Sequence, residues 1–211
     1  MSNRPHVAIL DHGMGNMRSV QKALERAGAE ATITSDVSII TDADALCVPG
    51  QGIFGRCVRA LTATGSDDLV REWIAADRPF LGICLGMQVL FDSSEEDDVP
   101  GLAVFEGAAT RLPRGVRVPH IGWNEIEPAG KGSVERQYFY FDHSYAVQPA
   151  DDSIVTGWCD HGIRFAAAIE TESLLGVQFH PEKSGAAGIE LLRRWMRTIA
   201  HQDASTMERR A

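Results

Sequence analysis

The chain has 211 residues, of which 44% are hydrophobic and 23% are charged, as in an ordinary globular protein. The net charge of −9 argues against a dedicated nucleic-acid binder, and the sequence shows neither a signal-peptide core nor a membrane-spanning apolar run. The length predicts a single α/β domain over residues 1–211. Four cysteines without metal-like spacing predict reduced thiols, no metal site and a cytoplasmic location.

The first half alternates short apolar runs with amphipathic segments. Strands are predicted over residues 7–10, 31–34 and 45–48, and helices over residues 36–42, 54–63 and 67–77. Between the first two strands, a helix is predicted to start at the N-cap Asn16 and to end at Gly28. Gly13-x-Gly15 resembles a dinucleotide loop, but Arg18 replaces the third glycine, which argues against nucleotide binding. The alternation predicts a mostly parallel, doubly wound sheet with helices on both faces.

Residues 78–91 carry the pattern Gly82-x-Cys84-x-Gly86 between an apolar run and a segment with helical periodicity. This spacing is that of a nucleophile elbow, a tight turn from strand to helix, with cysteine in place of serine. The flanking positions must be small, and the nucleophile stands at a helix N-terminus that favours a thiolate. The alternative is a small core cysteine, and the glycine pattern alone does not decide between the two.

Two loops are predicted on either side of this stretch. The segment Pro49-Gly50-Gln51-Gly52 follows the third strand. It is either a plain turn or, at the same sheet edge as Cys84, a loop whose backbone N–H groups face a ligand. The acidic run at residues 95–98 predicts a solvated loop.

The second half is richer in short strands, predicted over residues 107–112, 123–127, 137–141, 154–158 and 163–169. They predict a mixed or antiparallel extension of the sheet. A further strand over residues 174–179 ends before His180, because Pro181 stops it. Glu182 is spaced to fix the imidazole tautomer of His180, although a loop histidine without catalytic role is the other interpretation. Ser184 is the predicted cap of a final helix that frays from Gln202.

Together, the motif G-x-C-x-G-x-Q at residues 82–88 and the motif Q-F-H-P-E at residues 178–182 resemble the catalytic motifs of class I glutamine amidotransferases. The resemblance implies the fold of that superfamily and a triad formed by Cys84, His180 and Glu182. The implied oxyanion hole uses the backbone of Gln51, Gly52 and Leu85. The implied substrate-binding residues are Gly50, Gly52, Gln88, His143, Ser144 and Tyr145.

Three more segments are similar to the glutaminase subunit of imidazole glycerol phosphate synthase. They are P-H-I-G-W-N at residues 119–124, D-H-G-M-G-N at residues 11–16 and F-D-H-S-Y at residues 141–145. This resemblance covers essentially the whole chain. His12, Gln51 and Ala146 depart from the usual tyrosine, valine and aromatic residue of that subunit, and none of the three departures removes a catalytic group.

The resemblance implies hydrolysis of glutamine to glutamate and ammonia through a γ-glutamyl thioester, without a cofactor. The implied partner is a (β/α)8-barrel cyclase subunit, which uses the ammonia to make imidazole glycerol phosphate and aminoimidazole carboxamide ribonucleotide in histidine biosynthesis. The implied interface residues are His12, His120, Trp123 and Asn124, and a strand start with a core tryptophan is the alternative for that segment. Two other functions stay open: the glutaminase subunit of another amidotransferase, such as anthranilate synthase, and a non-catalytic regulatory relative.

Overall fold

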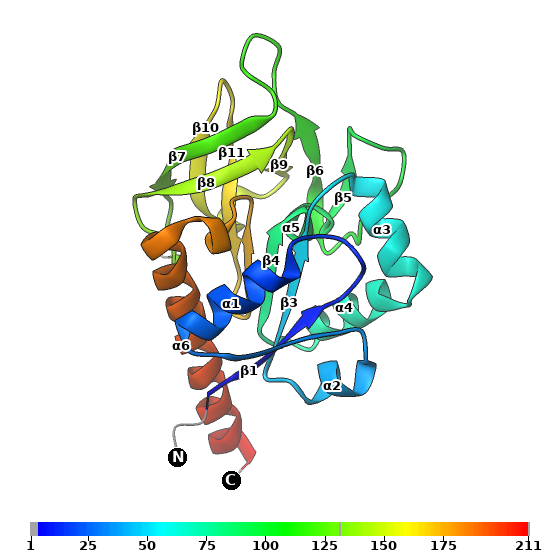
Figure 1. Cartoon of the computed structure of the whole chain (residues 1–211), viewed down its shortest axis with the longest axis vertical. Coiled ribbons are helices and arrows are strands. Elements are labelled where there is room, and N and C mark those ends of the chain that lie inside the picture. The colour runs from blue at the N-terminus through cyan, green and yellow to red at the C-terminus, as the bar shows by residue number, and fades with distance from the viewer. Residues whose placement is uncertain (1–3, 131, 211) are drawn as a thin grey trace.

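In the computed structural model, which describes residues 4–130 and 132–210, nine of the described strands form one sheet in the order β2-β1-β3-β4-β12-β11-β10-β7-β8 (Figure 1). These strands are β1 (His6–Leu10), β2 (Glu30–Thr34), β3 (Ala45–Gly50), β4 (Phe80–Cys84), β7 (His120–Pro128), β8 (Gln137–His143), β10 (Val155–Asp160), β11 (Arg164–Glu170) and β12 (Leu174–Val177). Pairing is parallel from β2 to β12 and antiparallel from β12 to β8. The predicted parallel sheet and its antiparallel extension are both confirmed.

Helices cover both faces of this sheet because successive strand residues point to opposite sides. Ile9 and Cys47 pack in one core with helices α1 (Met17–Ala27) and α6 (Gly185–Arg210). Leu10 and Leu46 pack in a second core with helices α3 (Phe54–Ala63) and α4 (Ser66–Ala75). The remaining helical elements are α2 (Val37–Asp42), α5 (Leu85–Gln88) and the 3-10 turns η1 (Asp152–Ile154) and η2 (Pro181–Lys183). No helix in the described part of the chain is long and apolar enough to cross a membrane.

A second sheet contains two strands that the sequence did not predict. It pairs β5 (Phe91–Ser94), β6 (Phe105–Arg111) and β9 (Tyr145–Pro149) in that order. The apolar periodicity after Cys84 predicted a longer helix, but α5 is a single turn and β5 begins soon after it. Only Ser144 separates β8 from β9, so the sequence signal of the two strands is continuous although they belong to different sheets.

Helix α1 begins and ends at the residues that the local sequence predicted. The Asn16 side chain accepts a hydrogen bond from the Ser19 N–H at the start of α1, and Gly28 ends that helix with φ of 118°, as predicted. At the other end of the chain, α6 continues to Arg210, beyond Gln202. The fraying expected from Gln202 stays a prediction.

Ser184 is not the side-chain cap that the sequence predicted. Its hydroxyl donates to the His180 carbonyl at 2.6 Å and accepts a hydrogen bond from the Tyr140 N–H at 2.9 Å. Both partners lie outside α6, and among the described residues no backbone N–H of that helix donates to the hydroxyl. Ser184 instead ties the segment after β12 to the neighbouring strand β8.

The acidic run at residues 95–98 does more than form a solvated loop, which corrects the prediction. The Glu96 carboxylate accepts a hydrogen bond from the Phe54 N–H at 2.8 Å, at the start of α3, where the preceding residue supplies no side-chain cap. The Asp97 carboxylate pairs with Arg59 at 3.1 Å. The run thus supplies a helix cap from a distant part of the sequence, which local spacing does not reveal.

Gly86→Ala is expected to lower the free energy of unfolding by about 3 kcal/mol, because an added Cβ would overlap the Val48 carbonyl oxygen on β3. Urea unfolding measures the change. Gly115→Ala is the control, since no atom lies within 4 Å of its added Cβ and only its φ of 101° is unfavourable. That control should cost about 1 kcal/mol. Equal losses in the two variants would contradict the close packing described for Gly86.

Candidate functional site

The C-terminal ends of β3, β4 and β12 meet at one edge of the sheet. In the parallel register, Gly50 lies opposite Cys84, and Ile83 lies opposite Val177. His180 follows β12 by three residues, and the Pro49-Gly50-Gln51-Gly52 segment leaves the end of β3. The structure therefore brings together three segments that the sequence predicted at one sheet edge, where open α/β sheets bind ligands.

The backbone at Cys84 is that of a sharp elbow. Its φ of 53° and ψ of −110° are unfavourable for a side chain that carries Cβ. Gly86 packs against the Val48 carbonyl, and a Cβ on Gly82 would lie 2.8 Å from the Gly86 carbonyl oxygen. The two glycines let strand β4 turn into α5 within one residue and hold the thiol at the start of that helix. This is the geometry that the glycine spacing predicted.

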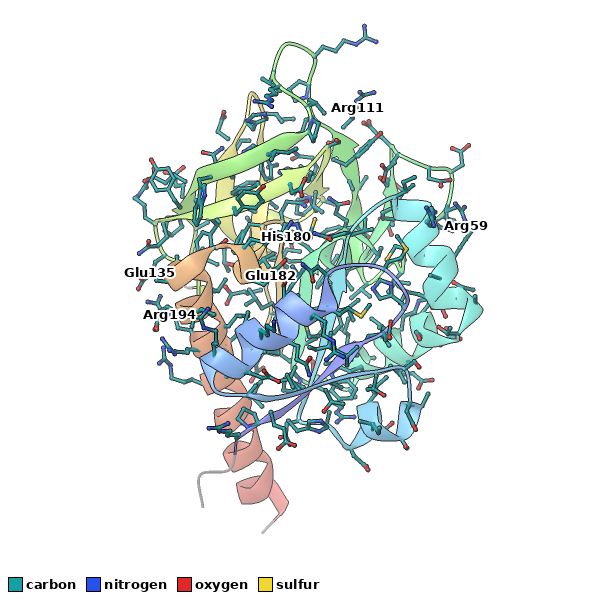
Figure 2. The ribbon with its side chains drawn as sticks, viewed as in Figure 1. Arg59, Arg111, Glu135, His180, Glu182 and Arg194 are labelled. Carbon is teal, nitrogen blue, oxygen red and sulfur yellow. The ribbon has the colours of Figure 1, made fainter. Side chains whose placement is uncertain are left out.

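His180 and Glu182 form a buried pair next to the elbow (Figure 2). The Nδ1 of His180 lies 2.8 Å from Oε1 of Glu182, and their side chains are 2% and 3% exposed. Burial opposes protonation of His180, but the Cys84 sulfur and the Glu182 carboxylate outweigh it, so the pKa of His180 is raised. The ring Nε2 is buried without a hydrogen bond in this conformation, so the bond that holds the ring is the one to Glu182.

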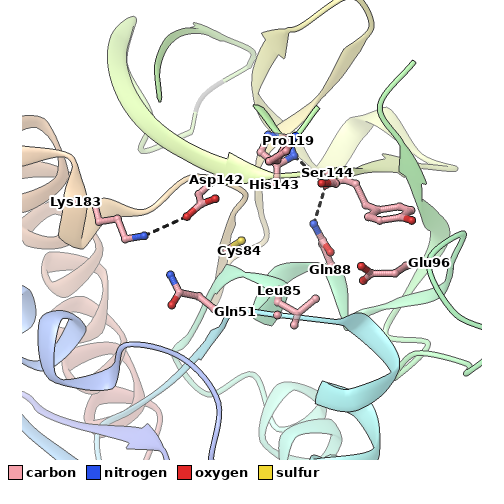
Figure 3. Close-up of a pocket in the computed structure, with 12 residues that line it drawn as sticks. Gln51, Cys84, Leu85, Gln88, Glu96, Pro119, Asp142, His143, Ser144 and Lys183 are labelled. Carbon is pink, nitrogen blue, oxygen red and sulfur yellow. Dashed lines mark hydrogen bonds and ion pairs between the residues drawn. The ribbon is translucent and has the colours of Figure 1, made fainter. Parts of the chain in front are cut away.

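A cavity of about 440 Å³ opens beside Cys84 (Figure 3). Its lining residues are Gln51, Gly52, Cys84, Leu85, Gln88, Glu96, Pro119, Asp142, His143, Ser144, Tyr145 and Lys183. Most of the predicted oxyanion and substrate residues are therefore together at one cavity. Gly50 does not line it but packs against the elbow, where its added Cβ would lie 2.7 Å from Leu85 Cβ. A contact between Gly50 and substrate stays a prediction.

Three charged residues at this cavity were missed by the sequence analysis. Lys183 Nζ pairs with the Asp142 carboxylate at 3.4 Å on one side of Cys84, and Glu96 lies on the other side (Figure 3). Lys183 was detectable as the neighbour of Glu182 in the His-Pro-Glu segment. Glu96 was not detectable, because only the tertiary fold places the acidic run against the cavity.

Two buried glutamine side chains form a hydrogen-bonded series that ends at Cys84. Gln88 is buried, and its amide nitrogen donates to the Tyr145 carbonyl and to Oε1 of Gln178, both at 2.9 Å. The Gln178 amide nitrogen donates in turn to the sulfur of Cys84 at 3.6 Å. The sequence analysis named Gln88 but missed Gln178, which is two residues before His180 in the same motif.

The four predicted interface residues do not share one environment. Trp123 is 56% exposed and Asn124 is partly exposed, but His12 and His120 are buried. His12 Nε2 lies 2.7 Å from the Pro49 carbonyl oxygen, inside the molecule. His12 and His120 therefore offer little surface in the free chain, and their part in an interface stays a prediction. Sequence alone did not reveal this because their burial depends on tertiary contacts.

The glutamine amidotransferase class-I family matches residues 8–199. Subunit HisH of imidazole glycerol phosphate synthase from Aromatoleum aromaticum is 43% identical over 202 residues, covering 88% of this chain and 95% of that protein. The HisH subunit from Rhodopirellula baltica is 45% identical over 196 residues, covering 90% and 96%. A crystal structure of a glutamine amidotransferase shares the fold, with a TM-score of 0.74 at 22% identity over 92% of this chain and 98% of that one.

The match to the family, the identity to HisH subunits over nearly their full length and the shared fold agree with one another. This chain belongs to the class I glutamine amidotransferases, in the group of HisH subunits of imidazole glycerol phosphate synthase.

Proposed function

We propose that the chain is the glutaminase subunit of imidazole glycerol phosphate synthase and hydrolyses glutamine at Cys84 to supply ammonia for histidine biosynthesis. The observation that carries this proposal is the juxtaposition of the Cys84 elbow with the buried His180–Glu182 pair beside an open cavity. The segment at residues 122–124, Gly-Trp-Asn, disfavours the glutaminase subunit of anthranilate synthase. The presence of Cys84, His180 and Glu182 disfavours a non-catalytic relative.

In this mechanism, the Cys84 sulfur attacks the side-chain amide carbon of glutamine, and the carbonyl electron pair moves onto oxygen. His180 carries the thiol proton and gives it to the departing nitrogen, which leaves as ammonia and a γ-glutamyl thioester remains. Water then attacks the thioester, His180 accepts its proton, and glutamate and the free thiol are released. The raised pKa of His180 suits a ring that holds this proton, and Glu182 fixes its orientation.

The developing oxyanion needs N–H donors already in place. Leu85 N–H at the start of α5 and a backbone N–H of Gln51 or Gly52 are the proposed donors, and each is worth roughly 3–4 kcal/mol in a preorganised site. The side chains of both Gln51 and Leu85 line the cavity. The valine-to-glutamine departure at position 51 leaves this role intact, because the backbone performs it.

The polar groups of the cavity suit a free amino acid. The Glu96 carboxylate is the proposed partner of the substrate ammonium group, and Lys183, beside Asp142, offers a positive charge. The backbone at Ser144 and Tyr145 completes the substrate site. The arrangement offers charges of both signs, as a zwitterion requires.

The proposed partner is a (β/α)8-barrel cyclase subunit that docks on the β7–β8 hairpin. Three large apolar side chains there are more than a third exposed: Ile121, Trp123 and Tyr138. Ile121, Trp123 and Glu125 are every second residue of β7, so their side chains point to the same face of the sheet. Tyr138 pairs with Glu125 and therefore lies on that face too. Such a cluster favours a protein interface. We also propose a single functional domain over residues 1–211, because both hydrophobic cores share one sheet. The proposed location is cytoplasmic.

Cys84→Ala is expected to lower glutamine-dependent synthesis by the complex at least roughly 10⁴-fold, because the nucleophile is lost. Ammonia-dependent synthesis should stay nearly unchanged. A glutamine analogue with an electrophilic side chain should label Cys84, which lines the cavity, and spare Cys47, Cys57 and Cys159, which do not. Burial raises the pKa of the Cys57 and Cys159 thiols to about 12, so their thiolates are scarce. Peptide mass mapping of the label on another cysteine would contradict the assignment.

His180→Ala should lower the glutaminase kcat by roughly 10⁴-fold or more, and Glu182→Gln should lower it by one to two orders of magnitude less, since Glu182 transfers no proton. The double variant should lose far less than the product of the two separate losses, because the pair acts as a unit. Steady-state kinetics of the complex measure all three. Losses that multiply would show that Glu182 acts independently of His180.

The chain without its partner is expected to be a poor glutaminase. Gly50-Gln51-Gly52 can turn a peptide N–H away from the oxyanion at low steric cost, and losing one donor slows the reaction by roughly 10²–10³-fold. Partner binding with a ligand in the cyclase site would then favour the donating arrangement. The glutaminase rate is measured for the chain alone, with the cyclase subunit, and with that subunit and its ligand. The rate should rise at each step, and three equal rates would eliminate this gating.

A further inference from the structure

The Cys84 sulfur accepts a hydrogen bond from a group outside the proposed triad. The Gln178 side chain is completely buried, and its amide nitrogen lies 3.6 Å from Sγ. The His180 ring also lies beside the sulfur, which helps to raise the pKa of the ring, although its Nε2 has no hydrogen bond of good geometry in this conformation. The Gln178 amide is therefore a second donor beside the sulfur, and Cys84 is itself only 6% exposed, in surroundings where a hydrogen bond to a charged group is strong.

The orientation of the Gln178 amide is fixed by its neighbours. Its oxygen accepts a hydrogen bond from the Gln88 amide nitrogen at 2.9 Å. The same nitrogen of Gln88 donates to the Tyr145 carbonyl, which can only accept. A flipped Gln178 amide would place two NH₂ groups against each other and a lone pair against sulfur. Gln178 must therefore present its N–H to Cys84.

The hydrogen-bond chain continues beyond Tyr145 toward the surface. His143 Nδ1 lies 2.9 Å from the Tyr145 carbonyl, and His143 Nε2 lies 3.0 Å from His120 Nδ1. His120 Nε2 lies 3.3 Å from the Asn124 amide nitrogen, which also donates to the Asp160 carbonyl at 2.9 Å. Because the carbonyl only accepts, His143 and His120 must each carry their proton on Nδ1 and accept on Nε2.

This pattern needs both rings to be neutral, and their environment keeps them so. Burial, with the nearby His161 ring, lowers the pKa of His120 to about 4. Burial lowers the pKa of His143 to about 3, although its hydrogen bond to the Tyr145 carbonyl opposes the change. His120 is also stacked between Phe141 and His161, with ring centroids 4.8 and 4.0 Å away. The rings are held in place as well as uncharged.

We propose that Gln178 is a further catalytic residue, whose amide N–H stabilises the Cys84 thiolate. A positioning chain fixes this amide, and it consists of Gln88, the Tyr145 carbonyl, His143, His120 and Asn124. The inference rests on the proposed role of Cys84 as nucleophile. It gives the buried Gln178 a chemical task and links the nucleophile to strand β7, which carries the exposed Trp123.

The test uses the full-length chain and the rate at which iodoacetamide alkylates Cys84, followed by peptide mass mapping across a range of pH. Gln178→Met keeps the side-chain length and removes the donor. It should move the midpoint of the pH profile upward by about one unit and lower kcat of the complex roughly 10- to 100-fold, as expected for a lost hydrogen bond to a charged group. The KM for glutamine should change less than kcat, because Gln178 does not itself line the cavity and reaches it only through its contact with Gln88.

Gln148→Met is the matched control, since the Gln148 amide donates to the Arg164 carbonyl and has no contact with the chain of hydrogen bonds. Its alkylation profile should coincide with that of the unmodified protein. If Gln178→Met does not fold, Gln178→Glu keeps the shape and should move the midpoint in the same direction. Asn124→Leu, at the far end, should produce a smaller shift in that direction.

The outcomes separate this inference from the proposed function. An unmodified protein whose Cys84 is not alkylated would overturn the nucleophile assignment itself. Alkylation of Cys84 with a profile that Gln178→Met, or Gln178→Glu in its place, leaves unchanged would overturn the catalytic role of Gln178 alone. A shift with the Gln178 variant but none with Asn124→Leu would remove the outer part of the positioning chain and keep Gln178.

Discussion

The strained backbone of Cys84 depends on close packing at the ends of β3 and β4. Strand β3 brings the Val48 carbonyl against Gly86, and Gly50 packs against Leu85. A residue with an unfavourable φ persists only where its surroundings leave it no alternative, and these contacts supply that constraint. The same parallel register places the 49–52 segment and the end of β12 beside the thiol. One packing arrangement therefore determines the positions of Cys84, the 49–52 segment and His180.

The cavity forms where the two sheets diverge. His143 ends β8 of the large sheet, and Tyr145 begins β9 of the small sheet, with Ser144 between them. The small sheet thus contributes the Tyr145 carbonyl, which accepts from both Gln88 and His143. A backbone carbonyl inside a strand ladder has little freedom to move, so it is a rigid anchor for side chains that approach from two directions. One of those side chains, His143, is positioned by strand β8 in the antiparallel half of the large sheet.

The sequence predicted those features that depend on local pattern. The spacing of Gly82, Cys84 and Gly86 indicated the elbow, although the glycine pattern alone did not exclude a core cysteine, and Asn16 and Gly28 were sufficient for the ends of α1. The features that were missed depend on contacts between distant segments. Glu96 caps a helix 42 positions away in sequence, and the donor role of Gln178 appears only once the fold places Gln88 beside it. The burial of His12 has the same origin, because it follows from packing against β3 and not from its neighbours in the sequence.

Strand β8 is the last strand of the large sheet, and the face that it shares with β7 carries exposed Trp123 and Tyr138. An edge strand beside an apolar face is a site where identical chains associate wrongly. If a partner subunit covers this face, as proposed above, each copy of the chain without that partner exposes an aggregation-prone edge. Assembly would then protect the chain from self-association.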